Sequence, residues 1–171
     1  MICPGCNSNI PDDSKICKDC NYCFSESSEV SEHKDSKKNI DPKKNKLRVL
    51  IVDDVAFMRI TLKKLLLKNG FNVIGEANNG VVAIMCYKIY KPDIVIMDIS
   101  MPGTNKYHYG GLDAIKDIIT FDPSAKIIVC SALSDKSTIM EAIERGAKAY
   151  LIKPFDTKNL VNTINGVALT F

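Results

Sequence analysis

The chain has 171 residues, enough for one ordinary domain and a smaller appended segment. Apolar residues make up 46% of it, which permits a hydrophobic core, and the net charge of +3 is too small an excess to indicate nucleic acid binding. No apolar run approaches the roughly 18 residues of a membrane span, and the N-terminus lacks the basic and apolar regions of a signal peptide. We therefore expect a cytoplasmic protein that does not enter a membrane.

Cysteine is concentrated at the start of the chain, where five of the seven residues lie within positions 1–23. In a reducing compartment such clustering favours a metal site over disulfides, and two CxxC pairs supply the four thiolates that tetrahedral Zn²⁺ prefers. The predicted ligands are Cys3, Cys6, Cys17 and Cys20. Iron in the same cage, or a register that uses Cys23, remains an alternative. The segment resembles a short zinc ribbon of the CPxC…CxxC type, and it should be unfolded without metal because its core is small.

Residues 24–46 are rich in serine, lysine and glutamate and have almost nothing to bury, which predicts a flexible charged linker. The first 46 residues together carry 8 lysines and 8 acidic residues, hence no net charge. This balance weakens the hypothesis that the ribbon binds DNA or RNA, because such binding depends on an excess of positive charge. Binding of a partner protein, or simple capping of the N-terminus, are the other interpretations of the ribbon.

From residue 47 onward, short β-branched runs alternate with longer stretches of helical period. The expected strands are 47–53, 71–77, 93–98, 125–131 and 148–152, and the expected helices are 55–69, 79–90, 111–120, 134–145 and 156–168. Five consecutive strand–helix units predict an α/β domain over residues 47–171, in which a doubly wound parallel sheet is covered by helices on both faces.

Several residues predict where these helices begin and end. Glycines follow the first and fourth helices as stop signals, and a serine and an aspartate precede the fourth and fifth as N-caps. These residues are Gly70, Gly146, Ser134 and Asp156. The Lys91-Pro92 step should close the second helix, because the residue before a proline is driven out of the right-handed α region. The two later cysteines, Cys86 and Cys130, lie in apolar segments and are interpreted as small buried hydrophobic residues.

Five polar side chains follow the expected strands, and in open parallel sheets ligands bind at the carboxyl ends of strands. Asp53 and Asp54 end the first strand and Asp98 ends the third. Ser131 ends the fourth strand and Lys153 follows the fifth. Three neighbouring carboxylates repel one another unless a cation binds, and Mg²⁺ is the natural candidate because it accepts carboxylates while retaining waters beside a phosphate. An ammonium, a hydroxyl and a cation around one carboxylate predict a phosphoryl site with an aspartyl acceptor.

These residues carry a resemblance over residues 47–171. The motifs are the DD of VLIVDD, the D of IVIMDISMP, the SA of IIVCSA and the KP of AYLIKPF, in this order. The segment resembles a response-regulator receiver domain of the CheY-like kind. The resemblance implies a flavodoxin-like sheet of order 2-1-3-4-5 and a phosphohistidine donor on a sensor histidine kinase or phosphotransfer protein.

The resemblance also implies a role for each matching residue. Asp98 would be the phospho-acceptor. Asp53 and Asp54 would help to hold Mg²⁺ together with Asp98, and the backbone carbonyl of Ser100 would be a further ligand. Lys153 would pair with the phosphate, and its peptide bond to Pro154 would be cis.

Signal output would depend on two further positions. Ser131 would contact the phosphoryl group and shift on activation, and the rotamer of Tyr150 would follow it. The change would reach the face formed by the fourth helix, fifth strand and fifth helix by a shift between two populated states. Because no helix-turn-helix or catalytic segment follows the fifth helix in this sequence, we expect output through protein–protein contact or through the ribbon. A phosphorelay intermediate is one form of this hypothesis, and chemotaxis control is another.

Two features depart from the family pattern. The letters GTNKYHYG at 103–110 come before Gly111 and form an apparent insertion of about five residues beside the acceptor. It is interpreted either as tolerated loop variation or as a contact loop that uses Tyr107, His108 and Tyr109. Leu133 lies two residues beyond Ser131, and the family often tunes dephosphorylation at this position and at the position of Ser100. We expect no enzyme activity on a separate substrate, although autodephosphorylation, and a phosphatase or phosphotransferase with the same aspartate chemistry, are the alternatives.

Overall fold

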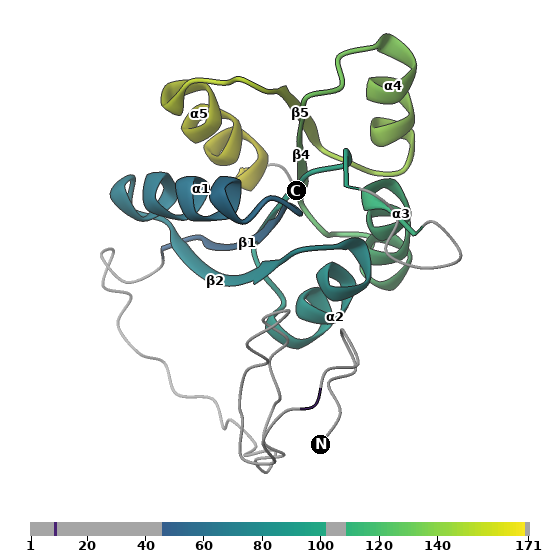
Figure 1. The fold of residues 1–171 in the computed structure, drawn as a ribbon, viewed down its shortest axis with the longest axis horizontal. Coiled ribbons are helices and arrows are strands. Elements are labelled where there is room, and N and C mark those ends of the chain that lie inside the picture. Colours follow the sequence, from purple (N-terminus) through teal and green to yellow (C-terminus); the bar gives the residue numbers. More distant parts are fainter. Residues whose placement is uncertain (1–8, 10–45, 102–108, 170–171) are drawn as a thin grey trace. The chain divides into compact units, whose positions relative to one another are not determined.

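A computed structural model describes residues 46–101 and 109–169, together with Asn9 (Figure 1). Contacts divide the chain into two units, Met1–Lys46 and Leu47–Phe171. The four cysteines predicted to bind zinc, and the predicted linker up to residue 45, lie outside the described residues. Among the residues that are described, no helix is both long and apolar enough to cross a membrane.

The second unit is a parallel sheet of five strands in the order β2-β1-β3-β4-β5, with a helix after each strand (Figure 1). The strands are β1 (Arg48–Val52), β2 (Asn72–Ala77), β3 (Ile94–Met97), β4 (Ile127–Ser131) and β5 (Ala149–Ile152). The helices are α1 (Ala56–Lys68), α2 (Gly80–Tyr90), α3 (Gly111–Phe121), α4 (Lys136–Glu144) and α5 (Thr157–Ala168). The predicted fold class and strand order are confirmed.

Helices cover both faces of the sheet because the central strands are apolar on both sides. Every residue of β3 and β4 is buried, as is β1 after Arg48. Side chains from α1 and α5 pack on one face, and side chains from α2, α3 and α4 pack on the other. Cys86 and Cys130 are buried and are not joined in a disulfide, as the sequence predicted, and burial raises the pKa of the Cys130 thiol to about 12.

Most of the predicted helix ends are confirmed. Gly70 and Gly146 follow α1 and α4 with φ values of 89° and 108°, in the left-handed region that glycine adopts without strain. Lys91 closes α2 and is itself left-handed at φ 43°, so the residue before Pro92 has left the right-handed α region. Asp156 caps α5 by accepting a hydrogen bond from the Asn159 N–H group.

The prediction that Ser134 caps α4 is wrong. The helix begins at Lys136, so the N-cap is Asp135, whose carboxylate accepts hydrogen bonds from the Thr138 N–H group and the Ser137 hydroxyl at 2.8 and 2.7 Å. A carboxylate offers more acceptor sites than a serine hydroxyl and suits the positive end of the helix dipole. The hydrogen bonds from Thr138 and Ser137 lower the pKa of Asp135 to about 2.

Strand register places the chemistry-bearing residues at one edge of the sheet. Val52, the last residue of β1, pairs with Met97, the last residue of β3, so the residues after these strands are neighbours. Ser131 at the end of β4 pairs with Ile152 at the end of β5. Because all five strands are parallel, their carboxyl ends open toward the same loops, which is where a ligand site is expected.

Candidate functional site

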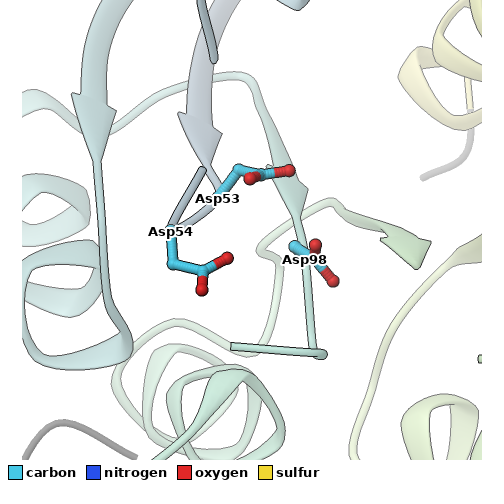
Figure 2. A group of neighbouring side chains, drawn as sticks. All are labelled: Asp53, Asp54 and Asp98. Carbon is cyan, nitrogen blue, oxygen red and sulfur yellow. The ribbon is translucent and has the colours of Figure 1, made fainter. Parts of the chain in front are cut away.

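Three carboxylates gather beyond β1 and β3 (Figure 2). Asp53, Asp54 and Asp98 each offer a carboxylate oxygen, and these atoms all lie within 4.8 Å of one another. Asp53 and Asp98 are only 1% and 5% exposed, whereas Asp54 is exposed. Hard oxygen donors of this kind, with one carboxylate open to water, fit Mg²⁺, which retains several waters and takes few protein ligands. The prediction that these three residues lie together is confirmed by the geometry.

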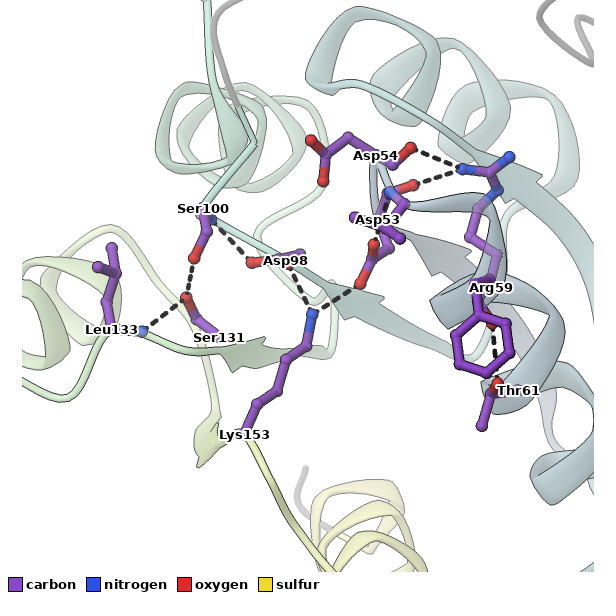
Figure 3. Close-up of polar contacts among 11 residues, drawn as sticks. Asp53, Asp54, Arg59, Thr61, Asp98, Ser100, Ser131, Leu133 and Lys153 are labelled. Carbon is purple, nitrogen blue, oxygen red and sulfur yellow. Dashed lines mark hydrogen bonds and ion pairs between the residues drawn. The ribbon is translucent and has the colours of Figure 1, made fainter.

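Lys153 lies between the two buried carboxylates. Its Nζ atom donates to Asp53 Oδ2 at 2.7 Å and to Asp98 Oδ2 at 2.6 Å (Figure 3). Burial by itself lowers the pKa of the Lys153 ammonium, but hydrogen bonds and charge interactions with the two aspartates outweigh this and raise the pKa above its ordinary value. With 15% of its side chain exposed, Lys153 is a partly buried partner of the acidic group and not a solvated surface lysine.

The backbone fixes the direction in which Lys153 enters the site. The Lys153 N–H group donates to the Ser131 carbonyl at 2.8 Å, which extends the pairing of β5 with β4 by one residue. The peptide bond between Lys153 and Pro154 is cis, as the family resemblance implied. The side chain therefore starts two strands away from β3 and spans β4 to reach Asp98.

The loop after β1 is held by contacts that the sequence analysis missed. The Asp53 N–H group donates to the Ala77 carbonyl at 3.1 Å, and Asp53 Oδ1 accepts the Val55 N–H group at 2.9 Å. Arg59 Nη1 donates to the backbone carbonyls of Asp53 and Asp54 at 2.8 and 3.2 Å (Figure 3). The signal was present in the sequence, because an arginine five residues after the aspartate pair lies about one turn into the helix that follows.

Ser131 is fully buried and its hydroxyl is paired with a second hydroxyl. The Ser131 Oγ and Ser100 Oγ atoms are 2.6 Å apart, and the Leu133 N–H group donates to Ser131 Oγ at 3.3 Å (Figure 3). The Ser100 N–H group in turn donates to Asp98 Oδ1 at 2.8 Å. The sequence analysis named Ser100 for its carbonyl and as a position that tunes dephosphorylation, and it did not anticipate these contacts of the Ser100 hydroxyl and N–H group.

Tyr150 is linked to the site through hydrogen bonds of Leu133 and Ser131. It lies on β5 opposite Val129, and its hydroxyl donates to the Leu133 carbonyl at 2.8 Å. Burial raises the pKa of the Tyr150 hydroxyl. Since the N–H group of Leu133 contacts Ser131, a single residue links the two side chains that the resemblance paired as a switch.

The predicted insertion is described only at its end. Tyr107 and His108 lie outside the described residues, but Tyr109 donates its hydroxyl to Asp117 Oδ2 on α3 at 2.6 Å. The ring of Tyr109 also lies against α2, where a Cβ atom added at Gly80 would come within 3.0 Å of it. Tyr109 therefore anchors the chain between two helices and is partly exposed, and the interpretation of residues 103–110 as a contact loop stays a prediction.

Comparison with known proteins gives a consistent result. The family model described as "Response regulator receiver domain" matches residues 49–165. The chemotaxis protein CheY of Thermotoga maritima is 52% identical over 121 residues, which cover 71% of this chain and 97% of that protein. CheY of Bacillus subtilis is 46% identical over 118 residues, covering 69% of this chain and 94% of that protein.

Among solved structures, the crystal structure of the CheX-CheY-BeF3-Mg+2 complex from Borrelia burgdorferi aligns with a TM-score of 0.67. The alignment is 32% identical and covers 72% of this chain and 90% of the matched chain.

Proposed function

The chain belongs to the response regulator receiver domain family, and we propose that it works by accepting a phosphoryl group on the carboxylate of Asp98. The observation that carries this proposal is the setting of that side chain. Asp98 Oδ2 receives the Lys153 ammonium at 2.6 Å, and two further carboxylates lie within 4.8 Å. A carboxylate and a phosphoryl group are both negative and repel each other. Positive charge from an ammonium and a bound cation on either side of the carboxylate removes this repulsion, so the carboxylate can act as the nucleophile.

In the proposed reaction the donor is a phosphohistidine on a sensor kinase or a phosphotransfer protein. A carboxylate oxygen of Asp98 attacks the phosphorus atom, the bond from phosphorus to the histidine nitrogen breaks, and its electron pair stays on the imidazole. The Lys153 ammonium then pairs with a phosphoryl oxygen, since it already lies within hydrogen-bonding distance of the acceptor.

Mg²⁺ would be held by Asp53, Asp54 and Asp98, with the Ser100 carbonyl as a further ligand, and when bound it neutralises the charge of the transferred phosphoryl oxygens. Protein residues hold this ligand set in place. Asp53 and Asp98 are buried at the paired ends of β1 and β3, so their positions are set by the sheet. Water would hydrolyse the acyl phosphate of phosphorylated Asp98 with time. This autodephosphorylation is the only turnover that we propose.

We further propose that output passes through Ser131 and Tyr150 to a protein partner. A phosphoryl group on Asp98 would offer the Ser131 hydroxyl a charged acceptor in competition with the Ser100 hydroxyl. A shift of Ser131 would move Leu133, whose N–H group it accepts, and Leu133 in turn accepts the Tyr150 hydroxyl through its carbonyl. Large apolar side chains are exposed on or beside α4 and β5, where a partner protein would find contact area. They are Leu133, Met140, Ile143 and Ile152.

The test of the phosphorylation chemistry is intact mass of the full chain after incubation with acetyl phosphate, in Mg²⁺ and in EDTA. We expect the mass of one phosphoryl group in Mg²⁺ and none in EDTA. Borohydride reduces an aspartyl phosphate to homoserine, so peptide mapping should place the modification at residue 98. Labelling of a different residue, or a folded chain that binds Mg²⁺ and takes no label, would contradict the proposal.

For the N-terminal segment we propose a zinc ribbon over residues 1–23, a linker over 24–46 and a receiver domain over 47–171. The support is the CxxC spacing, since the four thiolates are those that structural zinc sites use. The proposed ligands are Cys3, Cys6, Cys17 and Cys20. Iron in the same cage, or a ligand set that includes Cys23, is distinguished by the following measurement.

Native mass spectrometry should find one zinc ion in the wild-type chain and in Cys23→Ser, and none in Cys17→Ser. After strong chelation, alkylation should reach the N-terminal thiols, while the buried Cys86 and Cys130 stay unlabelled until the chain is unfolded. These two buried thiols are an internal control for folding. Loss of zinc in Cys23→Ser would show that the ligand set differs from the one proposed.

A further inference from the structure

Arg59 holds the backbone on which the acidic pair is built. One guanidinium nitrogen, Nη1, donates to the Asp53 carbonyl at 2.8 Å and to the Asp54 carbonyl at 3.2 Å (Figure 3). These consecutive carbonyls lie just past β1 and before α1, where no ladder or helix hydrogen bond is provided for them by regular structure. The Arg59 side chain is only 13% exposed, and of its two hydrogen bonds the one to the Asp53 carbonyl is partly buried and the one to the Asp54 carbonyl is exposed.

The guanidinium is itself held from its other side. Arg59 Nε lies 3.6 Å from Glu76 Oε2 on β2, and Lys63 Nζ donates to Glu76 Oε1 at 2.8 Å. Glu76 thus has two basic partners on the same helix, one turn apart. Of these two, only Arg59 also bonds the carbonyls of the aspartate pair in this structure.

Fixing these carbonyls fixes the directions of two side chains. Uncompensated changes of the backbone torsions on either side of the Asp53–Asp54 peptide would turn the carboxylates relative to each other, and the exposed Asp54 has no ladder pairing to resist them. Asp53 is better held, because its N–H group bonds Ala77 and its carboxylate bonds Lys153. Hydrogen-bonded neighbours of metal ligands are known to contribute to affinity by orienting the ligands.

We propose that Arg59 is a positioning residue for the divalent cation, which it never contacts: it locks the Asp53–Asp54 backbone so that both carboxylates face Asp98. This inference rests on the proposed Mg²⁺ site. The inference predicts that Mg²⁺ affinity falls when Arg59 is replaced, whereas simple electrostatics predicts that it rises. Removing a positive charge near an acidic site should strengthen cation binding by Coulomb's law, whereas loss of the positioning contact should weaken it.

The experiment compares Mg²⁺ titrations of the full-length, ¹⁵N-labelled wild type, Arg59→Met and Lys63→Met, followed through backbone amide shifts near Asp98. Both variants remove one positive charge and one partner of Glu76 from the same helix, but only Arg59→Met releases the two carbonyls. We expect the dissociation constant of Arg59→Met to rise by about 10-fold or more. That of Lys63→Met should stay within about 2-fold of wild type, because exposed charges are screened.

The same spectra report whether each variant is folded. If Arg59→Met does not fold, Arg59→Lys takes its place, since it keeps the charge but replaces the guanidinium fork with a single ammonium. A folded Arg59 variant that binds Mg²⁺ as tightly as wild type or Lys63→Met would overturn the positioning role alone. A wild-type chain that binds no Mg²⁺ would overturn both this inference and the proposed metal site.

Discussion

Replacing Asp98 with asparagine is expected to remove all phosphoryl labelling while the fold is retained. The amide nitrogen carries no nucleophilic lone pair of the kind that a carboxylate oxygen offers, so the acyl phosphate cannot form. The amide oxygen can still accept the Ser100 N–H group, which the carboxylate accepts at 2.8 Å. On the other side, an NH₂ group would meet the Lys153 ammonium, so one charge-assisted hydrogen bond is lost at a cost of about 1.5–3 kcal/mol.

That cost is offset in part because asparagine removes one of two buried negative charges, so the free energy of unfolding of Asp98→Asn should fall by less than the full amount. The matched control is Asp54→Asn, which removes the exposed carboxylate of the same cluster and keeps the acceptor. We expect that variant to accept one phosphoryl group but to require more Mg²⁺. Intact mass distinguishes the two variants directly, and persistent labelling of Asp98→Asn would exclude Asp98 as the acceptor.

Replacing Lys153 with methionine is expected to destabilise the domain strongly, and Mg²⁺ is expected to restore much of the loss. Without the ammonium, the buried carboxylates of Asp53 and Asp98 face each other with no positive partner. Breaking a buried ion pair by removing one partner costs about 3–5 kcal/mol, and the partial exposure of Lys153 places the expected value near the lower end. A bound divalent cation would supply the missing charge, so the variant should depend on Mg²⁺ far more than wild type does.

Urea unfolding in EDTA and in saturating Mg²⁺ measures this difference, and Lys148→Met is the control because Lys148 is an exposed lysine just before β5. If Lys153→Met loses the same free energy of unfolding in EDTA as in Mg²⁺, the expectation that Mg²⁺ replaces the charge of the Lys153 ammonium is contradicted. Acetyl phosphate labelling of the variant should also be slower, since no ammonium remains to pair with the phosphoryl oxygens.

The stabilisation by Lys153 should depend on pH in a defined direction. Its pKa is raised in the folded chain from the ordinary value of 10.5, so the folded state binds the proton more tightly than the unfolded state. The advantage of wild type over Lys153→Met is therefore complete below pH 10.5 and is lost as the pH rises through the folded pKa.

The sequence predicted the sheet, its order and the shared edge because each depends on patterns that tolerate small errors. Asp53 and Asp98 follow apolar strands, and parallel pairing brings such ends together whether the strand ends one residue earlier or later. The cap of α4 was predicted wrongly as Ser134 for the opposite reason, since a cap depends on the first helical residue and α4 begins two residues later than expected.

The missed contacts are of a different kind. The hydroxyl pair of Ser100 and Ser131 depends on side-chain rotamers 31 residues apart, and the Arg59 contact depends on which face of α1 turns toward the end of β1. Neither follows from periodicity, because a pattern of apolar residues says which side of a helix is buried and not which polar group a side chain reaches.

The span of the Lys153 contacts has a consequence for when the domain becomes competent during synthesis. Lys153 is 55 residues beyond Asp98 and 100 residues beyond Asp53, so Asp98, the proposed acceptor, leaves the ribosome well before its ammonium partner. A nascent chain that ends before β5 carries the carboxylates without that charge, and contacts of such separation form late because they close long loops. If Asp98 accepts a phosphoryl group as proposed, we expect this to require the completed sheet, so that an unfinished or partly unfolded chain takes no label.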